Sequence, residues 1–122
     1  MSESEVPPIR VGIRLAVSYR EARFQQAVVT IGRSTPGQGN APHVDLSQDE
    51  SVSRQHAEIR WTAAGYTVVD LGSTNGTRLN GRKLEPNTPA PLSDGDRIAV
   101  GRLCVLTVST VDSADAGSSA SA

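Results

Sequence analysis

The sequence predicts an all-β fold, a β-sandwich of short and mostly antiparallel strands. Apolar residues alternate with polar ones or form short runs, and no stretch of the 122 residues shows the apolar spacing of a helix. Turn residues interrupt these runs about every 8 to 12 residues, as in sandwiches. Hydrophobic residues make up 37% of the chain but aromatics only 3%, so the core must consist of small aliphatic side chains, which favour strands.

The first strand is expected over residues 9–18, where Ile9, Val11 and Ile13 alternate with more polar residues as in a half-buried strand. Two Pro, two Gly and an Asn fall within residues 34–42, which predicts an exposed loop. The N-terminal third is therefore expected to contain strands at 9–18, 23–26, 28–31 and 43–46, with a turn at 20–22 between the first two.

Two strand-like runs in the middle of the chain, residues 57–61 and 66–71, are expected to pair as a hairpin. Polar loops rich in Gly and hydroxyl groups precede and follow this hairpin, at 51–56 and 72–77. Both loops should therefore emerge at the same end of the fold. The remaining strands are expected at 77–80, 82–85, 96–100 and 103–109, with an Asn80-Gly81 turn of the type that closes tight hairpins and a Pro-rich excursion over 86–91.

The chain is long enough for one domain with tails. Residues 1–8 are polar and end in two Pro, which predicts a flexible leader, and residues 9–109 hold all the strand signals. Residues 110–122 are small and polar, as in a disordered tail or linker, and they also agree with a chain that is part of a larger protein.

Charge and cysteine content exclude several classes of function. Twelve Lys and Arg against 13 Asp and Glu give a net charge of -1, so we expect no nucleic-acid partner. Cys104 is the single cysteine and lies in an apolar run, where it predicts a core thiol and neither a disulfide nor a metal site. No stretch is apolar enough for a membrane span or a signal peptide, so we expect a cytoplasmic chain without a membrane partner.

Several short motifs occur in a fixed order along the strands. They are GR at 32–33, SRQH at 53–56, GSTNGT at 72–77, DGD at 94–96 and IAVG at 98–101. In this order and spacing, over roughly residues 11–108, the chain resembles the forkhead-associated (FHA) domain. The resemblance implies an eleven-stranded β-sandwich whose apical loops bind phosphothreonine peptides, and hence a Ser/Thr kinase upstream.

The resemblance also implies the roles of individual residues. Arg33 and Ser53 would contact the phosphate, Arg54 would add charge or a backbone donor, Thr74 would close the phosphate site, and Asn75 would hold the peptide main chain. Gly32, His56 and Gly76 would support the loops. The chemistry of the side chains agrees, because a phosphothreonine carries a charge of about -1.5 to -2 and three strong acceptor oxygens. Its site needs convergent donors and at least one fixed cation, such as the forked guanidinium of Arg33.

Some of the same residues also occur in enzymes, metal sites and simple turns. Ser53, His56 and Asp70 contain the groups of a catalytic triad, but the chain lacks a nucleophile elbow and a nucleotide-binding loop, so we expect no enzyme. His43 and His56 have no partners at a metal-ligand spacing, and we expect neither metal nor cofactor. Asn75-Gly76 alone would also fit a simple turn.

We therefore predict a monomeric phosphothreonine-dependent interaction module, an adaptor in Ser/Thr kinase signalling. The alternative is a scaffold with an FHA-like fold that binds its partner without phosphate. The loss of binding with rising salt would distinguish them, because affinity for a dianion is screened by ions.

Overall fold

The computed structural model describes residues 6–15, 18–35, 37, 39 and 41–110, and these residues form eleven strands and no helix. Accordingly, no described helix could span a membrane. The predicted tail from 111 onward and residues 1–5 of the predicted leader lie outside the described residues. The strands are β1 (Ile9–Arg14), β2 (Tyr19–Phe24), β3 (Val28–Gly32), β4 (Val44–Asp45), β5 (Ala57–Thr62), β6 (Gly65–Asp70), β7 (Thr77–Leu79), β8 (Arg82–Lys83), β9 (Ala90–Pro91), β10 (Arg97–Val100) and β11 (Cys104–Thr110).

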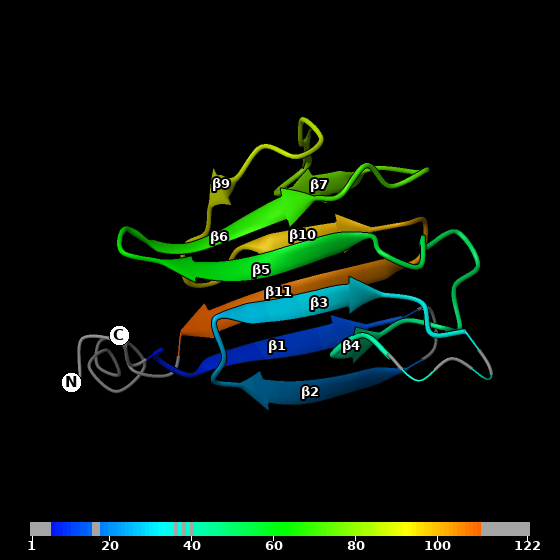
Figure 1. Cartoon of the computed structure of the whole chain (residues 1–122), viewed down its shortest axis with the longest axis horizontal. Helices are drawn as coiled ribbons and strands as arrows, with labels where there is room; N and C mark the ends of the chain where they lie inside the picture. Colours follow the sequence, from blue (N-terminus) through cyan, green and yellow to red (C-terminus); the bar gives the residue numbers. More distant parts are fainter. Residues whose placement is uncertain (1–5, 16–17, 36, 38, 40, 111–122) are drawn as a thin grey trace.

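The strands form two sheets that pack face to face (Figure 1). The six-stranded sheet has the order β2-β1-β11-β10-β7-β8, and the five-stranded sheet has the order β4-β3-β5-β6-β9. Neighbouring strands are antiparallel except for the short β3 and β4 pair, which is parallel. The predicted sandwich of mostly antiparallel strands is confirmed.

The core lies between the sheets and is aliphatic. Ile9, Val11 and Ile13 of β1 are almost fully buried, whereas Arg10 and Arg14 are exposed, so the alternation in the sequence marks the two faces of the sheet. Val and Ile side chains of β3, β5 and β6 pack against them from the other sheet. Cys104 at the start of β11 is also buried in this core, as its apolar surroundings in the sequence predict.

The two large aromatics of the central hairpin close one end of the core. Trp61 is half-buried and packs edge-on against Tyr66, with 4.9 Å between the ring centroids. The hydroxyl of Tyr66 donates a hydrogen bond to the carbonyl of Pro7. This bond ties the segment before β1 to the opposite sheet.

Two expectations about the short elements were wrong. The turn expected at 20–22 lies inside β2, all six residues of which pair with β1. β2 is an edge strand held by backbone bonds and its side chains are mostly exposed, so it shows no apolar alternation. The Pro-rich excursion contains β9, whose Pro91 is tolerated because an edge strand needs donors on one side only.

The Asn80-Gly81 turn between β7 and β8 is confirmed. Asn80 has a φ of 51° and Gly81 a φ of 88°, the two positive values that a type I′ hairpin turn requires. By contrast, Gly76 has a positive φ but Asn75 does not, so Asn75-Gly76 is not a turn of this type. Asn75 therefore occupies its position for another reason.

Candidate functional site

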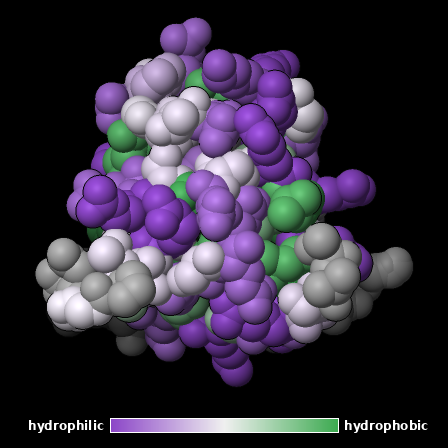
Figure 2. All heavy atoms as spheres, turned by 90° about the vertical axis from the view of Figure 1, so that its right-hand side faces the viewer, coloured by the Kyte–Doolittle hydropathy of each residue, from purple (hydrophilic) through white to green (hydrophobic). Residues whose placement is uncertain are grey.

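Three loops meet at one end of the sandwich, at the right of Figure 1. Ala57 at the start of β5 pairs with Ile31 near the end of β3 and with Asp70 at the end of β6, so these strand ends lie side by side. The loops between β3 and β4, β4 and β5, and β6 and β7 therefore converge, as the hairpin in the sequence predicts. We call this end the rim. Figure 2 faces this end, whose surface is largely hydrophilic.

Arg33 enters the rim directly after β3 and is half-buried. Its Nε donates a hydrogen bond of 2.8 Å to the carbonyl of Val52 in the loop before β5. Among the described residues, its two terminal nitrogens have no hydrogen-bond partner. The guanidinium is thus held at one point while most of its donors remain available to a ligand.

Ser53 and Thr74 are joined across two loops. The backbone N–H of Thr74 donates to the Ser53 Oγ at 3.0 Å, so the Ser53 hydroxyl proton is not used in this contact. Thr74 itself is exposed, and its hydroxyl makes no hydrogen bond to another described residue. Two short hydroxyl donors therefore face the same end of the molecule as Arg33.

His56 lies beneath these loops and is fully buried. The backbone N–H of Ser53 donates to its Nδ1 at 3.0 Å, so Nδ1 carries the lone pair. The proton must then sit on Nε2, which lies 2.8 Å from the carbonyl of Gly76 and donates to it. The neutral imidazole thus joins the loop before β5 to the loop after β6.

Asn75 makes a second connection between the same loops. Its Nδ2 donates to the carbonyl of Ser51 at 2.8 Å, and the side chain is half-buried. The amide oxygen and the second N–H make no bond to the other described residues. An amide with one free acceptor and one free donor matches the main chain of an extended peptide.

Gly32 is required by a close approach of two backbones. A Cβ at this position would lie 2.0 Å from the carbonyl oxygen of Arg54, a distance that no side chain can adopt. The missing side chain lets the Arg54 backbone pass directly over the end of β3. The Arg54 side chain is exposed and has no ion-pair partner in the described part of the chain.

A family model for the FHA domain matches residues 29–101, more than half of the 122 residues. The chain belongs to the FHA family. Apart from Val28, the first residue of β3, all the strands that carry the rim, from β3 to β7, lie within the matched segment of this FHA domain.

Two bacterial regulators are similar in sequence to this FHA domain. The glycogen accumulation regulator GarA of Mycolicibacterium smegmatis is 36% identical over 91 residues, which are 74% of this chain and 56% of that protein. The oxoglutarate dehydrogenase inhibitor of Corynebacterium jeikeium is 41% identical over 73 residues, 59% of this chain and 49% of that protein. The chain thus spans about half the length of these relatives.

Solved structures agree with the fold. An FHA domain from a structural and functional analysis of phosphothreonine-dependent FHA interactions has a TM-score of 0.65 and 32% identity. The match covers 83% of this chain and 96% of that chain. An engineered FHA domain with a Myc-pTBD peptide has a TM-score of 0.73 and 29% identity, and covers 88% of this chain and 94% of that one.

Asp70 shapes the loop after β6, a role that its place in the sequence, where it suggested only a triad carboxylate, did not predict. Its carboxylate is buried and accepts hydrogen bonds from the hydroxyls of Ser73 at 2.5 Å and Thr77 at 2.6 Å. It also accepts the backbone N–H groups of Gly72 and Ser73. Four bonds to one carboxylate fold the loop that presents Thr74 and Asn75.

Asp49 has the same function in the loop before β5. This buried carboxylate accepts from the N–H of Ser51 at 2.9 Å and from its hydroxyl at 2.5 Å. It also accepts from the N–H of Leu103 at 3.0 Å, in the turn between β10 and β11. Asp49 therefore ties the loop that carries Ser53 to the opposite sheet.

A local pattern in the sequence marks these carboxylates. Asp45, Asp49 and Asp70 each accept a bond from the hydroxyl of a Ser two or three residues later, and each accepts neighbouring backbone N–H groups. Asp followed closely by Ser is a recognised signature of such side-chain turns. The spacing could have identified all three, but only the fold shows which are buried.

These carboxylates make the stability of this FHA domain depend on pH in the acidic range. Burial raises the pKa of Asp70, but bonds from Ser73, Thr77 and Gly72 outweigh it and hold the pKa below its ordinary value. The pKa of Asp49 is also lowered, because bonds from Ser51 and Leu103 outweigh burial. As the pH falls, these carboxyls therefore take up protons in the unfolded chain before they do so in the folded one. The free energy of unfolding consequently decreases as the pH falls through the ordinary Asp value of about 3.9.

We expect the midpoint of urea unfolding to be steady from pH 7 to 5 and to fall steeply between about pH 4.5 and 2.5. The Asp70→Asn variant should show a shallower fall over the same interval, because one of the titrating groups is gone. Equal slopes for the two proteins would contradict the assignment of this loss to Asp70.

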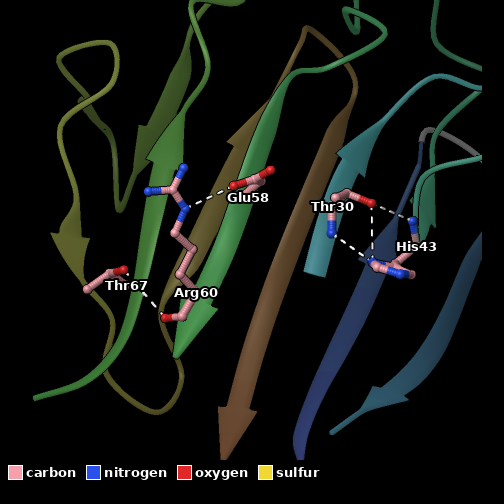
Figure 3. A network of polar contacts seen from close by, with 5 residues as sticks. All are labelled: Thr30, His43, Glu58, Arg60 and Thr67. Atoms are coloured by element: carbon pink, nitrogen blue, oxygen red, sulfur yellow. Dashed lines mark hydrogen bonds and ion pairs between the residues drawn. The ribbon is translucent and has the colours of Figure 1, made fainter. Parts of the chain in front are cut away.

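A groove of about 730 Å³ extends from the rim over the outer face of the five-stranded sheet. Arg33, Arg54 and Gln55 line it near the rim, and His43 and Glu58 line it further down. Figure 3 shows how this face is held: the N–H of Thr30 donates to His43 Nδ1 at 3.0 Å, and Arg60 pairs with Glu58 at 2.9 Å. The groove is therefore open and polar, and the Arg60–Glu58 ion pair lies beside it.

The geometry does not assemble the triad that the sequence contains. Both nitrogens of His56 are bonded to backbone groups, and Asp70 is bonded to the loop residues Gly72, Ser73 and Thr77. The Ser53 hydroxyl accepts from Thr74, and no described base makes a hydrogen bond to it. Among the described residues, no three His, Cys, Asp or Glu side chains gather as a metal site would require.

Proposed function

We propose that the rim binds a phosphothreonine within an extended segment of a partner protein. The observation that carries this proposal is the convergence of three loops that carry Arg33, Ser53, Arg54, Thr74 and Asn75, each of which keeps a side-chain donor that no other described residue uses. The chain then acts as a non-enzymatic adaptor downstream of a Ser/Thr kinase.

In this proposal the phosphate lies between Arg33 and the two hydroxyls. The terminal nitrogens of Arg33 supply a forked, charged donor, and the Ser53 and Thr74 hydroxyls supply short neutral donors. Arg54 adds a second positive charge from the exposed side. Together they can occupy the three acceptor oxygens of a phosphate dianion.

Asn75 reads the segment beyond the phosphate. Its free amide oxygen accepts a main-chain N–H and its free N–H donates to a main-chain carbonyl, so it holds an extended peptide whatever the side chains are. The bond from Nδ2 to Ser51 fixes the orientation of the amide before the ligand arrives. The Asn75 side chain therefore loses little conformational entropy when the peptide binds.

Calorimetric titration tests the proposal. A degenerate phosphothreonine peptide pool is compared with its phosphoserine and unphosphorylated counterparts. We expect micromolar affinity, a binding free energy of about 8 kcal/mol, for the phosphothreonine pool and for neither of the other two. This binding should weaken as the salt concentration is raised. Equal affinity for the unphosphorylated pool would sink the proposal and favour the phosphate-independent scaffold.

We further propose that the domain acts inside the cell, where Ser/Thr kinases modify their targets. It acts as a monomer, because a single rim holds a single phosphothreonine segment. Sedimentation at micromolar concentration should give the mass of one 12.8 kDa chain, with and without the phosphopeptide. A dimer that forms only with the peptide would contradict the monomeric mode.

A further inference from the structure

Six of the twelve Lys and Arg residues lie on one face of the molecule, the outer face of the six-stranded sheet. Residues paired in register, or two apart on one strand, share a face of a sheet. This rule links the six positions across β2, β1, β11, β10, β7 and β8, and all six side chains are exposed. We call this surface the basic face; its cations are Arg10, Arg14, Arg23, Arg78, Lys83 and Arg97.

The charge of the basic face is not neutralised by the described residues around it. Its one acidic side chain is Glu21, which accepts a hydrogen bond from the Tyr19 hydroxyl at 3.0 Å. None of the six cations takes part in an ion pair within the described part of the chain. On the other sheet, by contrast, Glu58 and Arg60 form a pair (Figure 3).

Two of the cross-strand pairs on this face join like charges. Arg10 lies directly opposite Arg23, and Arg78 lies directly opposite Lys83. Like charges placed opposite each other destabilise a sheet. The arrangement thus weakens the fold in a chain whose net charge is -1, a cost that an anionic partner would offset.

The basic face is continuous with the rim. The Cε of Lys83 lies 3.2 Å from the position that a Cβ at Gly76 would take, so this side chain borders the loop that carries Asn75. From there the cations continue along the outer face to Arg10, near the start of β1, and to Arg23, which pairs with it near the end of β2. A chain bound at the rim can therefore continue across this surface.

We propose that the basic face binds an acidic segment of the same partner polypeptide that places its phosphothreonine in the rim. This inference rests on the proposed function and adds a second contact to it. Five of the six cations are Arg, whose forked donors suit carboxylates. Bases would need an aromatic platform, but the Tyr19 ring already has the Arg14 guanidinium stacked over it, 5.4 Å from its centroid. Tyr19 is also the one large exposed apolar side chain that the described part of this face offers a membrane.

The dimensions agree with a short acidic run. Arg14 lies four positions after Arg10 along β1, a length of about 13 Å at the rise of a strand. About six extended Asp or Glu residues, joined to the phosphothreonine by a short spacer, would cover this length. Binding at the rim raises the local concentration of the acidic run, so weak exposed contacts can add to the affinity.

The test compares a phosphothreonine peptide that binds the rim with the same peptide extended by a Gly-Ser spacer and six Glu, placed before or after the core. At low salt we expect one of the two extensions to tighten binding about tenfold, since several exposed ion pairs add small contributions. The Arg10→Gln/Arg23→Gln variant should lose most of this gain and keep the affinity for the plain peptide. Arg60→Gln/Arg82→Gln, with the same net charge but with changes off the basic face, should behave as the wild type.

Each outcome decides between the proposals. No gain from either extension, or a gain that persists in Arg10→Gln/Arg23→Gln, overturns the acidic segment. The proposal is also overturned if the acidic extension has no effect while anionic vesicles or single-stranded RNA bind the protein through Arg10 and Arg23. If the plain phosphopeptide itself fails to bind, the proposed function fails; amide shifts of β1 and β2 caused by the Glu run alone would still support an acidic ligand.

The thermal unfolding of the variant is an independent check. Removing the opposed pair of cations should leave the midpoint of Arg10→Gln/Arg23→Gln equal to or above that of the wild type. A lower midpoint would assign these residues to the stability of the sheet and contradict a binding role.

Discussion

Replacing Arg33 with alanine is expected to weaken phosphothreonine binding by about 100-fold or more, close to 3 kcal/mol. Arg33 is the half-buried cation of the rim, and its Nε is fixed to the Val52 carbonyl. Its loss removes charge-assisted donors from the phosphate and also the bond that fixes their position. Titration of the variant with the phosphothreonine pool measures the effect directly.

Two matched variants separate charge from geometry. Arg33→Lys keeps the charge but cannot form both the Val52 contact and a forked contact with phosphate, so it should recover only part of the lost affinity. Arg54→Ala removes an exposed cation and should cost about tenfold or less. If Arg33→Ala binds as tightly as the wild type, while its spectra show a folded domain, the phosphate does not lie at Arg33.

The Asp70→Ala variant is expected to lose about 3 kcal/mol of the free energy of unfolding. The substitution leaves four donors of Gly72, Ser73 and Thr77 without their acceptor, and Thr77 is fully buried. Each buried donor left unsatisfied costs about 1 to 3 kcal/mol, and water admitted into the gap recovers part of it. Urea unfolding at pH 7 is the measurement.

Asp70→Asn keeps the shape of the side chain and retains one acceptor oxygen, so its loss should be clearly smaller. Glu85→Ala, an exposed acid, should change stability by less than about 0.5 kcal/mol. A similar small loss in Asp70→Ala would show that the loop after β6 does not depend on this carboxylate. Phosphopeptide affinity of the folded variant then reports whether Asp70 also positions Thr74 and Asn75.

The hairpin of β5 and β6 shows what could be predicted from sequence. Its two apolar runs and the polar loops beside them determine that both loops lie at one end, because antiparallel pairing brings the start of one strand beside the end of the next. The β2 strand shows the limit. An edge strand with exposed side chains leaves no apolar pattern, so only its pairing with β1 reveals it.

Within the rim, residue identity was predictable and residue contacts were not. The motifs placed Arg33, Ser53, Arg54, Thr74 and Asn75 in the loops, but not the bond from Asn75 to Ser51 or the protonation of His56. Those depend on which backbone groups approach from other loops. The roles of Asp49 and Asp70 likewise depend on their burial.

By itself the sequence determined the fold class, the position of most strands along the chain and the segments that form the rim, because alternation, turn residues and short motifs are local properties of the chain. Only the tertiary structure decided how distant segments combine. A net charge of -1 predicted no nucleic-acid partner and gave no sign of a basic surface, yet strand order and register gather half of the basic residues on one sheet face. Register is set by packing between the sheets, and one step of slip would exchange the faces of a strand.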